Sequence, residues 1–164
     1  MKLSGAAAAL LAVGGGAVAL LEPGLRAGRL SAGGRLVFGH VGQALLDGVL
    51  PNDPVALAQA LPAFLDRVDV LVSALPPHAQ GELSQLLALL AVAPGRRAIA
   101  GLGVSWPDAS VTQVQAALQS MRVSPLSLRQ QAYHALHDIT GAAYFSDAST
   151  WSILGYPGPT PVAA

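Results

Sequence analysis

Three side chains that could bind a metal ion lie close together toward the C-terminal end of the chain: His134, His137 and Asp138. On a helix, residues three and four positions apart share one face, so these three could coordinate a single ion. A closed zinc site needs four protein ligands, and the other histidines, His40 and His78, are remote in the sequence. We therefore expect a solvated or interface-facing polar edge here rather than a metal site.

Motifs of an independent enzyme are missing from the sequence. Serine, histidine and aspartate all occur, but no Gly-x-Ser-x-Gly elbow is present to hold a nucleophile. Gly101-Leu-Gly103 lacks the third glycine and the preceding strand of a dinucleotide fingerprint, and there is no phosphate-binding P-loop. Asp66 and Asp69 are three residues apart, which we interpret as one solvated helix face. We expect this chain to contain no catalytic, cofactor-binding or metal-binding residue.

The composition narrows the classes of partner. Of the 164 residues, 11% are charged and the formal net charge is zero, which gives no electrostatic case for nucleic acid. So few charges suit a chain that buries surface against a partner or a membrane, although a helical domain from a GC-rich genome would have a similar composition. The chain contains no cysteine, which excludes disulfides and cysteine-ligated zinc or iron–sulfur sites.

Four arginines could form a basic edge: Arg96, Arg97, Arg122 and Arg129. The simpler interpretation is that they compensate the charge at helix C-termini and form ordinary salt bridges.

Aromatic side chains concentrate near the C-terminus. Of the chain's two Trp, three Tyr and three Phe, four lie within a short stretch: Tyr144, Phe145, Trp151 and Tyr156. Asp147 or Ser149 can cap a short helix that carries Trp151, and Gly155 suits the left-handed residue that ends it. The prolines that follow cannot continue a helix and predict a rigid extended tail.

Two interpretations of this segment remain open. Tyr144 and Trp151 could close the core of this chain, or the rings and the tail could anchor a partner. We favour the partner, because large rings provide much contact area at little entropic cost and a proline-fixed tail loses little freedom on docking. The expected partner-binding residues are Tyr144, Phe145, Trp151, Tyr156, Pro157, Gly158 and Pro159.

The aromatic pair, the tryptophan six residues later and the terminal Gly-Tyr-Pro-Gly-Pro carry a resemblance to a known family. The chain resembles the small (gamma) accessory subunits of bacterial flavin dehydrogenases of the GMC type, such as the sorbitol, gluconate and FAD-dependent glucose dehydrogenase complexes. The similar region spans Val41 to Pro159, and its specific residues concentrate in Arg129–Pro159.

The resemblance implies a helical, non-catalytic subunit that binds no flavin. Such a subunit supports the maturation, export and membrane association of a large subunit, and stays bound to it. The large subunit would hold FAD and oxidise an alcohol, sugar or steroid-like hydroxyl, and a cytochrome c subunit or a quinone would accept the electrons. The implied location is the periplasm or the periplasmic side of the inner membrane. The alternative is a membrane-tethered helical structural or binding protein without a dehydrogenase partner.

The N-terminus departs from the pattern of that family. Leu3 to Leu21 is uncharged and eleven of its nineteen residues are Ala or Gly, which indicates a weakly hydrophobic membrane or export segment, or else a buried helix. Only Lys2 precedes the run, without the Arg-Arg pair of a twin-arginine signal, and the arginines that follow it oppose an N-inside orientation. We expect the membrane or export segment.

The remainder of the chain predicts an all-α fold. Residues 22–35, rich in Gly and Arg, are expected to be a linker, so that residues 1–35 form an N-terminal segment and residues 36–164 a helical domain. From Leu36 onward, apolar residues recur at helical spacing and proline-containing breaks separate about five helices. We expect Pro62 to kink the second helix or shift its start, and Asp108 to cap the fourth helix.

Overall fold

The computed structural model describes residues 21–155, with the backbone alone for residues 152–154. This part of the chain is mostly helical, which confirms the expected all-α class. The elements in chain order are β1 (Leu25–Arg26), β2 (Arg29–Leu30), α2 (Ala32–Leu45), α3 (Pro54–Ser73), α4 (Pro77–Ala91), α5 (Ala93–Gly95), the π-helical turn η1 (Arg96–Ala100), α6 (Val111–Arg122), α7 (Ser127–Phe145) and the 3-10 helix η2 (Ala148–Leu154).

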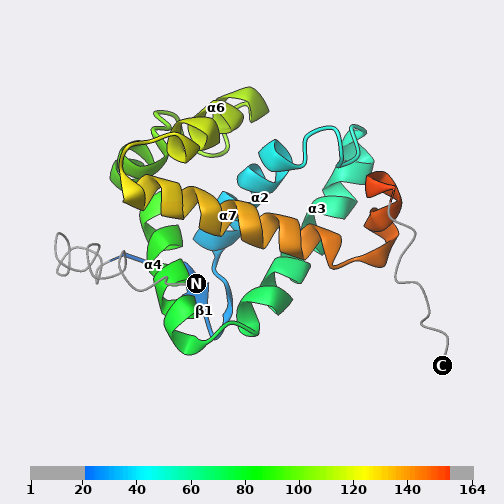
Figure 1. Ribbon diagram of the computed structural model, residues 1–164, viewed down its shortest axis with the longest axis horizontal. Helices are drawn as coiled ribbons and strands as arrows, with labels where there is room; N and C mark the ends of the chain where they lie inside the picture. The colour runs from blue at the N-terminus through cyan, green and yellow to red at the C-terminus, as the bar shows by residue number, and fades with distance from the viewer. Residues whose placement is uncertain (1–20, 156–164) are drawn as a thin grey trace.

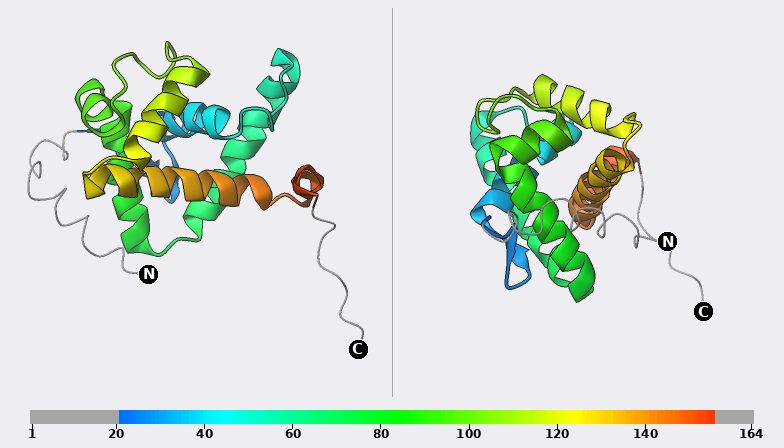
Figure 2. Two further views of the ribbon diagram at one scale, coloured as in Figure 1. Left: turned by 45° about the horizontal axis from the view of Figure 1, so that its top comes forward. Right: turned by 90° about the vertical axis from the view of Figure 1, so that its left-hand side faces the viewer.

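Helix α2 is the central element of the fold. It packs against α3, α4, α6 and α7, and α7 crosses the molecule from the α6 side to the α3 side (Figures 1 and 2). Gly42 allows the close approach of α2 and α3, because a Cβ at this position would lie 2.6 Å from Cε1 of Phe64. The two helices therefore depend on glycine here for their spacing.

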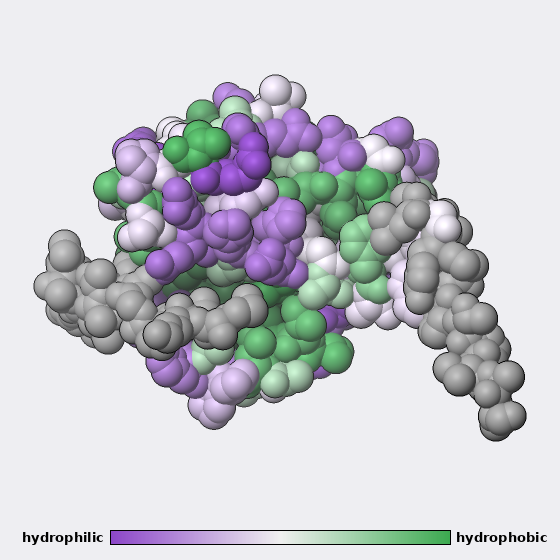
Figure 3. Space-filling model, in the orientation of Figure 1, coloured by the Kyte–Doolittle hydropathy of each residue, from purple (hydrophilic) through white to green (hydrophobic). Residues whose placement is uncertain are grey.

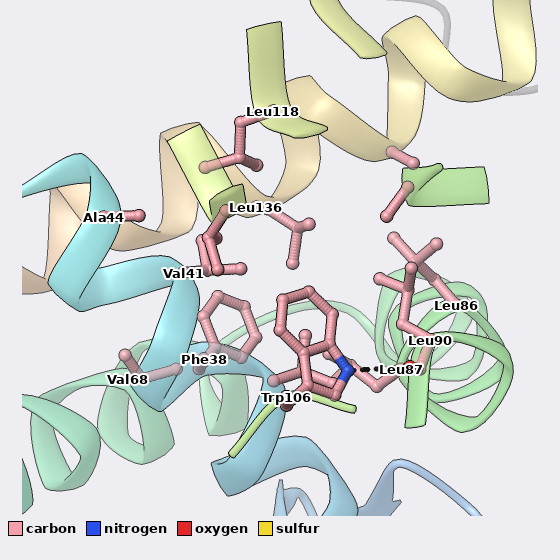
Figure 4. Close-up of a cluster of buried hydrophobic side chains, with 14 of the residues drawn as sticks. Phe38, Val41, Ala44, Val68, Leu86, Leu87, Leu90, Trp106, Leu118 and Leu136 are labelled. Atoms are coloured by element: carbon pink, nitrogen blue, oxygen red, sulfur yellow. Dashed lines mark hydrogen bonds between the residues drawn. The ribbon is translucent and has the colours of Figure 1, made fainter. Parts of the chain in front are cut away.

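The core lies between these five long helices. Its apolar side chains recur every three or four residues along each helix, which is the pattern that the sequence predicts. Truncating a fully buried ring such as Phe38 to alanine typically costs about 3–5 kcal/mol. The largest fully buried side chains are Trp106, Phe38, Phe64, Leu87, Leu90, Met121 and Leu136. Figure 4 shows Phe38, Leu87, Leu90, Trp106 and Leu136 among them.

Trp106 joins the loop before α6 to the end of α4. Its ring is buried, and its Nε1–H donates a hydrogen bond of 2.8 Å to the carbonyl oxygen of Leu90 (Figure 4). Leu90 lies in the last turn of α4, where carbonyl groups lack partners within the helix. The indole therefore satisfies a buried helix-end carbonyl while it fills the core.

One expected cap differs in the structure. Asp108 does not cap α6; Ser110 does, in a capping box in which its Oγ accepts from the Gln113 N–H and the Gln113 side chain accepts from the Ser110 N–H. Asp108 instead accepts a hydrogen bond from the Ser105 hydroxyl.

Helix α3 continues through Pro62. Pro62 and Ala58, one turn before it, are both exposed, so water can satisfy the carbonyl that loses its donor.

The expected linker over residues 22–35 is part of the folded domain in the structure. Strands β1 and β2 pair antiparallel as a hairpin, and α2 already begins at Ala32. Leu25 and Leu30 are buried, and the Leu25 N–H donates to Ser84 Oγ of α4 at 3.0 Å. Gly24 lies so close to α4 that a Cβ would fall 2.3 Å from the Leu87 Cβ. The hairpin therefore belongs to the core. The sequence does not reveal this, because strands this short, in a segment rich in Gly and Arg, show no apolar pattern.

Asp69 is likewise not on a solvated face. It is 5% exposed, and its two carboxylate oxygens accept from the Leu30 N–H and from Arg35 Nη1, each at 2.7 Å. Asp66 stays exposed and accepts from Arg35 Nη2 at 2.8 Å. Arg35 thus bridges both aspartates of α3, and Asp69 fixes the hairpin to that helix.

Candidate partner-binding segment

Helix α7 places the first two aromatic residues of the expected partner-binding set at its C-terminal end. Tyr144 is 6% exposed and forms part of the core, and its hydroxyl lies 3.5 Å from the Val49 carbonyl oxygen, to which it donates. Phe145 is half-buried and packs against the core, edge to face with Tyr144 at a ring-centre distance of 5.2 Å. Tyr144 therefore offers little surface to another molecule, whereas part of the Phe145 ring remains accessible.

The turn after α7 is organised by Asp147. Its Oδ1 accepts from the N–H of Ser149 at 3.0 Å and from the hydroxyl of Ser149 at 2.7 Å, so Asp147 performs the capping role expected at this place. The hydroxyl of Thr150 donates to the Asp147 carbonyl at 2.7 Å. These bonds turn the chain sharply and start η2.

Trp151 lies in η2 and is half-buried. Its Nε1–H donates to the Phe145 carbonyl oxygen at 2.8 Å, which brings the indole back toward the C-terminal end of α7. That carbonyl is one of those at the helix end that lack partners within the helix. Gly155 follows with a positive φ of 66°, the left-handed conformation predicted for it.

Arg67 of α3 holds the start of η2 in place. Its Nε donates to the Ala143 carbonyl at 3.1 Å, and its Nη1 lies 3.3 Å from Asp147 Oδ2. The hydrogen bonds from Ser149, together with the Arg67 charge, lower the pKa of Asp147 from its usual value of 3.8. Sequence reasoning did not find Arg67, because its contacts lie 76 and 80 residues away along the chain.

The structure thus brings together Tyr144, Phe145 and Trp151, one in the core and two at its edge. The other members of the expected set, Tyr156, Pro157, Gly158 and Pro159, lie outside the described residues. Tyr144 closes the core of this chain, as the first interpretation of the segment expects. Trp151 is only half-buried, so part of it remains at the surface, as the partner interpretation requires.

An apolar helix end lies at the same end of the molecule. Helix α3 has no charged residue from Pro54 to Leu65, and six of its residues there are exposed: Pro54, Val55, Ala58, Gln59, Pro62 and Ala63. Figures 1 and 2 show this N-terminal half of α3 projecting at the end of the molecule where η2 also lies. A partner that covers Trp151 could reach this uncharged surface as well.

The histidine cluster forms a different arrangement on the surface of α7. The Nδ1 of His137 lies 3.0 Å from Oδ1 of Asp138, and the Tyr133 ring stacks on His137 at 5.4 Å and meets His134 edge-on at 5.3 Å. Within residues 21–155 the structure brings no three His, Asp or Glu side chains together as metal ligands. This polar edge consists of ring contacts and one close contact between an imidazole and a carboxylate.

A shallow open hollow of about 400 Å³ lies between the loop after η1 and helix α6. Residues 100–104 line one side, and Gln113, Ala116, Ala117 and Ser120 line the other. None of these side chains can ionise or act as a strong nucleophile, so the hollow offers no acid–base chemistry.

No family model, curated protein or solved structure matches this chain in comparisons of its sequence and fold. Within residues 21–155 there is also no helix of the length and apolar character that crossing a bilayer requires.

Proposed function

We propose that this chain is the non-catalytic small subunit of a flavin-dependent dehydrogenase complex of the GMC type. It supports the maturation and export of the large subunit, which holds the FAD, and remains bound to it on the periplasmic side of the inner membrane. A cytochrome c subunit is a further candidate partner, and residues 3–21 are the proposed membrane or export segment. The observation that carries the proposal is the aromatic and proline-rich segment from Tyr144 to Pro159.

The geometry of the described part supports a binding role for that segment. Trp151 is held in one orientation by its bond to Phe145, and Arg67 and Asp147 fix the backbone that leads to it. A pre-organised ring loses little freedom when a partner covers it, and tryptophan is the residue most often found at the energetic centre of an interface. The uncharged half of α3 at the same end adds surface that a large subunit can cover.

The test is the affinity of Trp151→Ala for the large subunit. The partner to use is a GMC-type flavoprotein encoded by a neighbouring gene, co-expressed and purified with the full chain. Truncating a tryptophan in a packed interface typically costs about 2–4 kcal/mol, so we expect affinity to fall roughly 30- to 1000-fold. Trp151→Phe is the matched variant: it keeps an aromatic ring, loses the bond to Phe145 and should retain more of the binding.

The control is the melting temperature of the free subunit. If Trp151 contacts the partner, the free Trp151→Ala chain melts nearly like the parent, and flavin absorbance appears only in fractions that contain the large subunit. A variant that melts normally and still binds the large subunit as tightly as the parent would contradict the proposal. The lack of any flavoprotein gene beside this one would favour the alternative, a membrane-tethered helical binding protein without a dehydrogenase partner.

A further inference from the structure

The connection between α6 and α7 presents large apolar side chains to solvent. Val123 is 64% exposed and Leu126 is 60% exposed, and Pro125 between them is exposed as well. The buried residue Ser124 holds this turn, because its Oγ accepts from the Leu126 N–H at 3.2 Å and its carbonyl accepts from the Gln130 side chain at 2.8 Å. Val123 and Leu126 are therefore exposed on a turn that hydrogen bonds hold in place.

Arg122 and Arg129 flank this connection in the sequence, and Arg96 and Arg97 lie in η1. Within residues 21–155, Arg26, Arg35 and Arg67 form ion pairs with carboxylates. The salt bridges that the sequence suggested for the arginines of η1, α6 and α7 are not formed in this part of the chain. These arginines are Arg96, Arg97, Arg122 and Arg129.

Arg129 shows how closely the three elements converge. Its Nε donates to the Ile99 carbonyl of η1 at 2.7 Å, and its Nη2 donates to the Ser120 hydroxyl of α6 at 3.1 Å. Arg97 precedes Ile99 by two residues, and Arg122 follows Ser120 by two. Both Arg97 and Arg122 are exposed, and Arg122 directly precedes Val123 of the apolar turn.

Acidic groups near α6 lie toward its other end. Asp47 accepts from the Gln115 side chain at 3.1 Å, and Asp108 accepts from Ser105 in the loop before the helix. Within the described part of the chain, neither of these carboxylates pairs with Arg122 or Arg129. Apolar and strongly hydrophilic surface lie next to each other at the left-hand end of the molecule in Figure 3, over this connection.

We propose that the α6–α7 corner, made of Arg97, Arg122, Val123, Leu126 and Arg129, is a docking surface for an anionic lipid bilayer. Aliphatic side chains on an ordered turn can enter the boundary between lipid headgroups and chains, while surrounding arginines bind the phosphates. The corner and the aromatic segment lie at opposite ends of α7, whose 19 residues span about 28 Å. The bilayer and a protein partner can therefore bind at the same time. This inference does not rest on the dehydrogenase assignment.

The test exploits the absence of cysteine from the sequence. In the full chain, Leu126→Cys and Val123→Cys are each labelled with an environment-sensitive fluorophore. The matched control is Val70→Cys on α3, at a residue that is 67% exposed and lies away from the corner. The probes are vesicles of phosphatidylcholine alone and of phosphatidylcholine mixed with phosphatidylglycerol. Reading each position separately distinguishes contact by the corner from binding through residues 3–21.

We expect the labels at 123 and 126 to shift to the blue, and to be quenched by spin-labelled lipid, only with the anionic vesicles. The label at 70 should stay in water. Arg97→Gln and Arg122→Gln should each weaken the response of the label at 126 about fivefold. Equal responses at 126 and 70, or an unchanged response in both arginine variants, would overturn the proposal. Shielding of the label at 126 that grows with protein concentration in the absence of vesicles would assign the corner to self-association instead.

Discussion

At the scale of single residues, charge in this protein is used mainly to hold elements together. Asp69 and Arg67 lie on α3 within one turn of each other, and each bonds a segment remote in the sequence: the hairpin for Asp69 and the end of α7 for Arg67. The sequence predicts a solvated helix face for Asp69, because a pattern of polar residues does not distinguish a solvated carboxylate from a paired one.

Removing the charge of Asp69 should destabilise the fold more than removing the charge of Asp66. Asp69→Asn weakens two bonds of a buried carboxylate, and hydrogen bonds to charged groups contribute about 1.5–3 kcal/mol each in favourable cases, so we expect a loss of about 1–3 kcal/mol. Asp66→Asn removes an exposed pair and should cost less than about 1 kcal/mol. Urea unfolding of both variants measures the difference, and equal losses would show that burial of Asp69 is not decisive.

Asp147 links the order of the η2 turn to pH. Because its pKa is lowered in the folded chain, its contribution to stability is fully present above the unfolded value of about 3.8 and is lost as the pH falls through the folded pKa. Carboxyl-carbon NMR can follow this titration directly. Ser149→Ala should raise the pKa of Asp147 more than Arg67→Gln does, because the hydroxyl bond is the larger cause. The reverse order would mean that the arginine charge dominates.

At the scale of elements, helices were predictable and the hairpin was not. Five long helices lie where the apolar spacing and the proline breaks predict them, because each buries one continuous stripe. Strands β1 and β2 have two residues each, too short for an alternating pattern, and their turn contains Ala27, which sequence rules do not associate with a tight hairpin. What fixes the hairpin is tertiary contact with α3 and α4, which no local pattern records.

Substitutions at the two central residues of the hairpin turn should change stability in opposite directions. Ala27 and Gly28 both have positive φ, 49° and 75°, as a two-residue turn of type I′ requires. Gly28→Ala should cost about 1–2 kcal/mol, and Ala27→Asn should stabilise by up to about 1 kcal/mol. Gly81→Ala is the control, because Gly81 is an exposed helical residue with open space around its Cβ position, and this variant should gain about 0.5–1 kcal/mol. Thermal melts of the three variants test all these signs together.

At the scale of the whole molecule, the folded domain extends further toward the N-terminus than the sequence predicts. A chain that begins at residue 21 keeps the hairpin and should melt close to the parent. A chain that begins at residue 32 loses Leu25, Leu30 and the partner of Asp69, and should be strongly destabilised. If both truncated chains melted alike, the hairpin would not belong to the core. The chain that begins at residue 21 also tests the role of residues 3–21. If cell fractionation found this truncated chain delivered in full to the membrane or periplasm, residues 3–21 would not be the export signal.

The candidate site was partly predictable from residue types. Aromatic enrichment, the cap at Asp147 and the left-handed Gly155 are local properties, and the structure agrees with the last two. Which aromatic residues enter the core and which remain at the surface was not predictable. Tyr144 enters the core because α7 packs on α2 and α3. The exposed α6–α7 corner was missed for the same reason: which arginines find carboxylates depends on contacts between distant segments.

The hairpin also has a consequence for the time at which this chain can finish folding as it is made. Gly24 and Leu25 bond to Ser84, and the second of these contacts spans 59 residues. A ribosome that adds about 5–20 residues per second reaches Ser84 roughly 3–12 s after Leu25. Throughout that interval the segment next to residues 1–20 has no docking site, so those residues stay tethered to an unfolded stretch of chain. The order of synthesis thus leaves a period of seconds in which the hairpin segment is exposed to any factor that binds nascent chains.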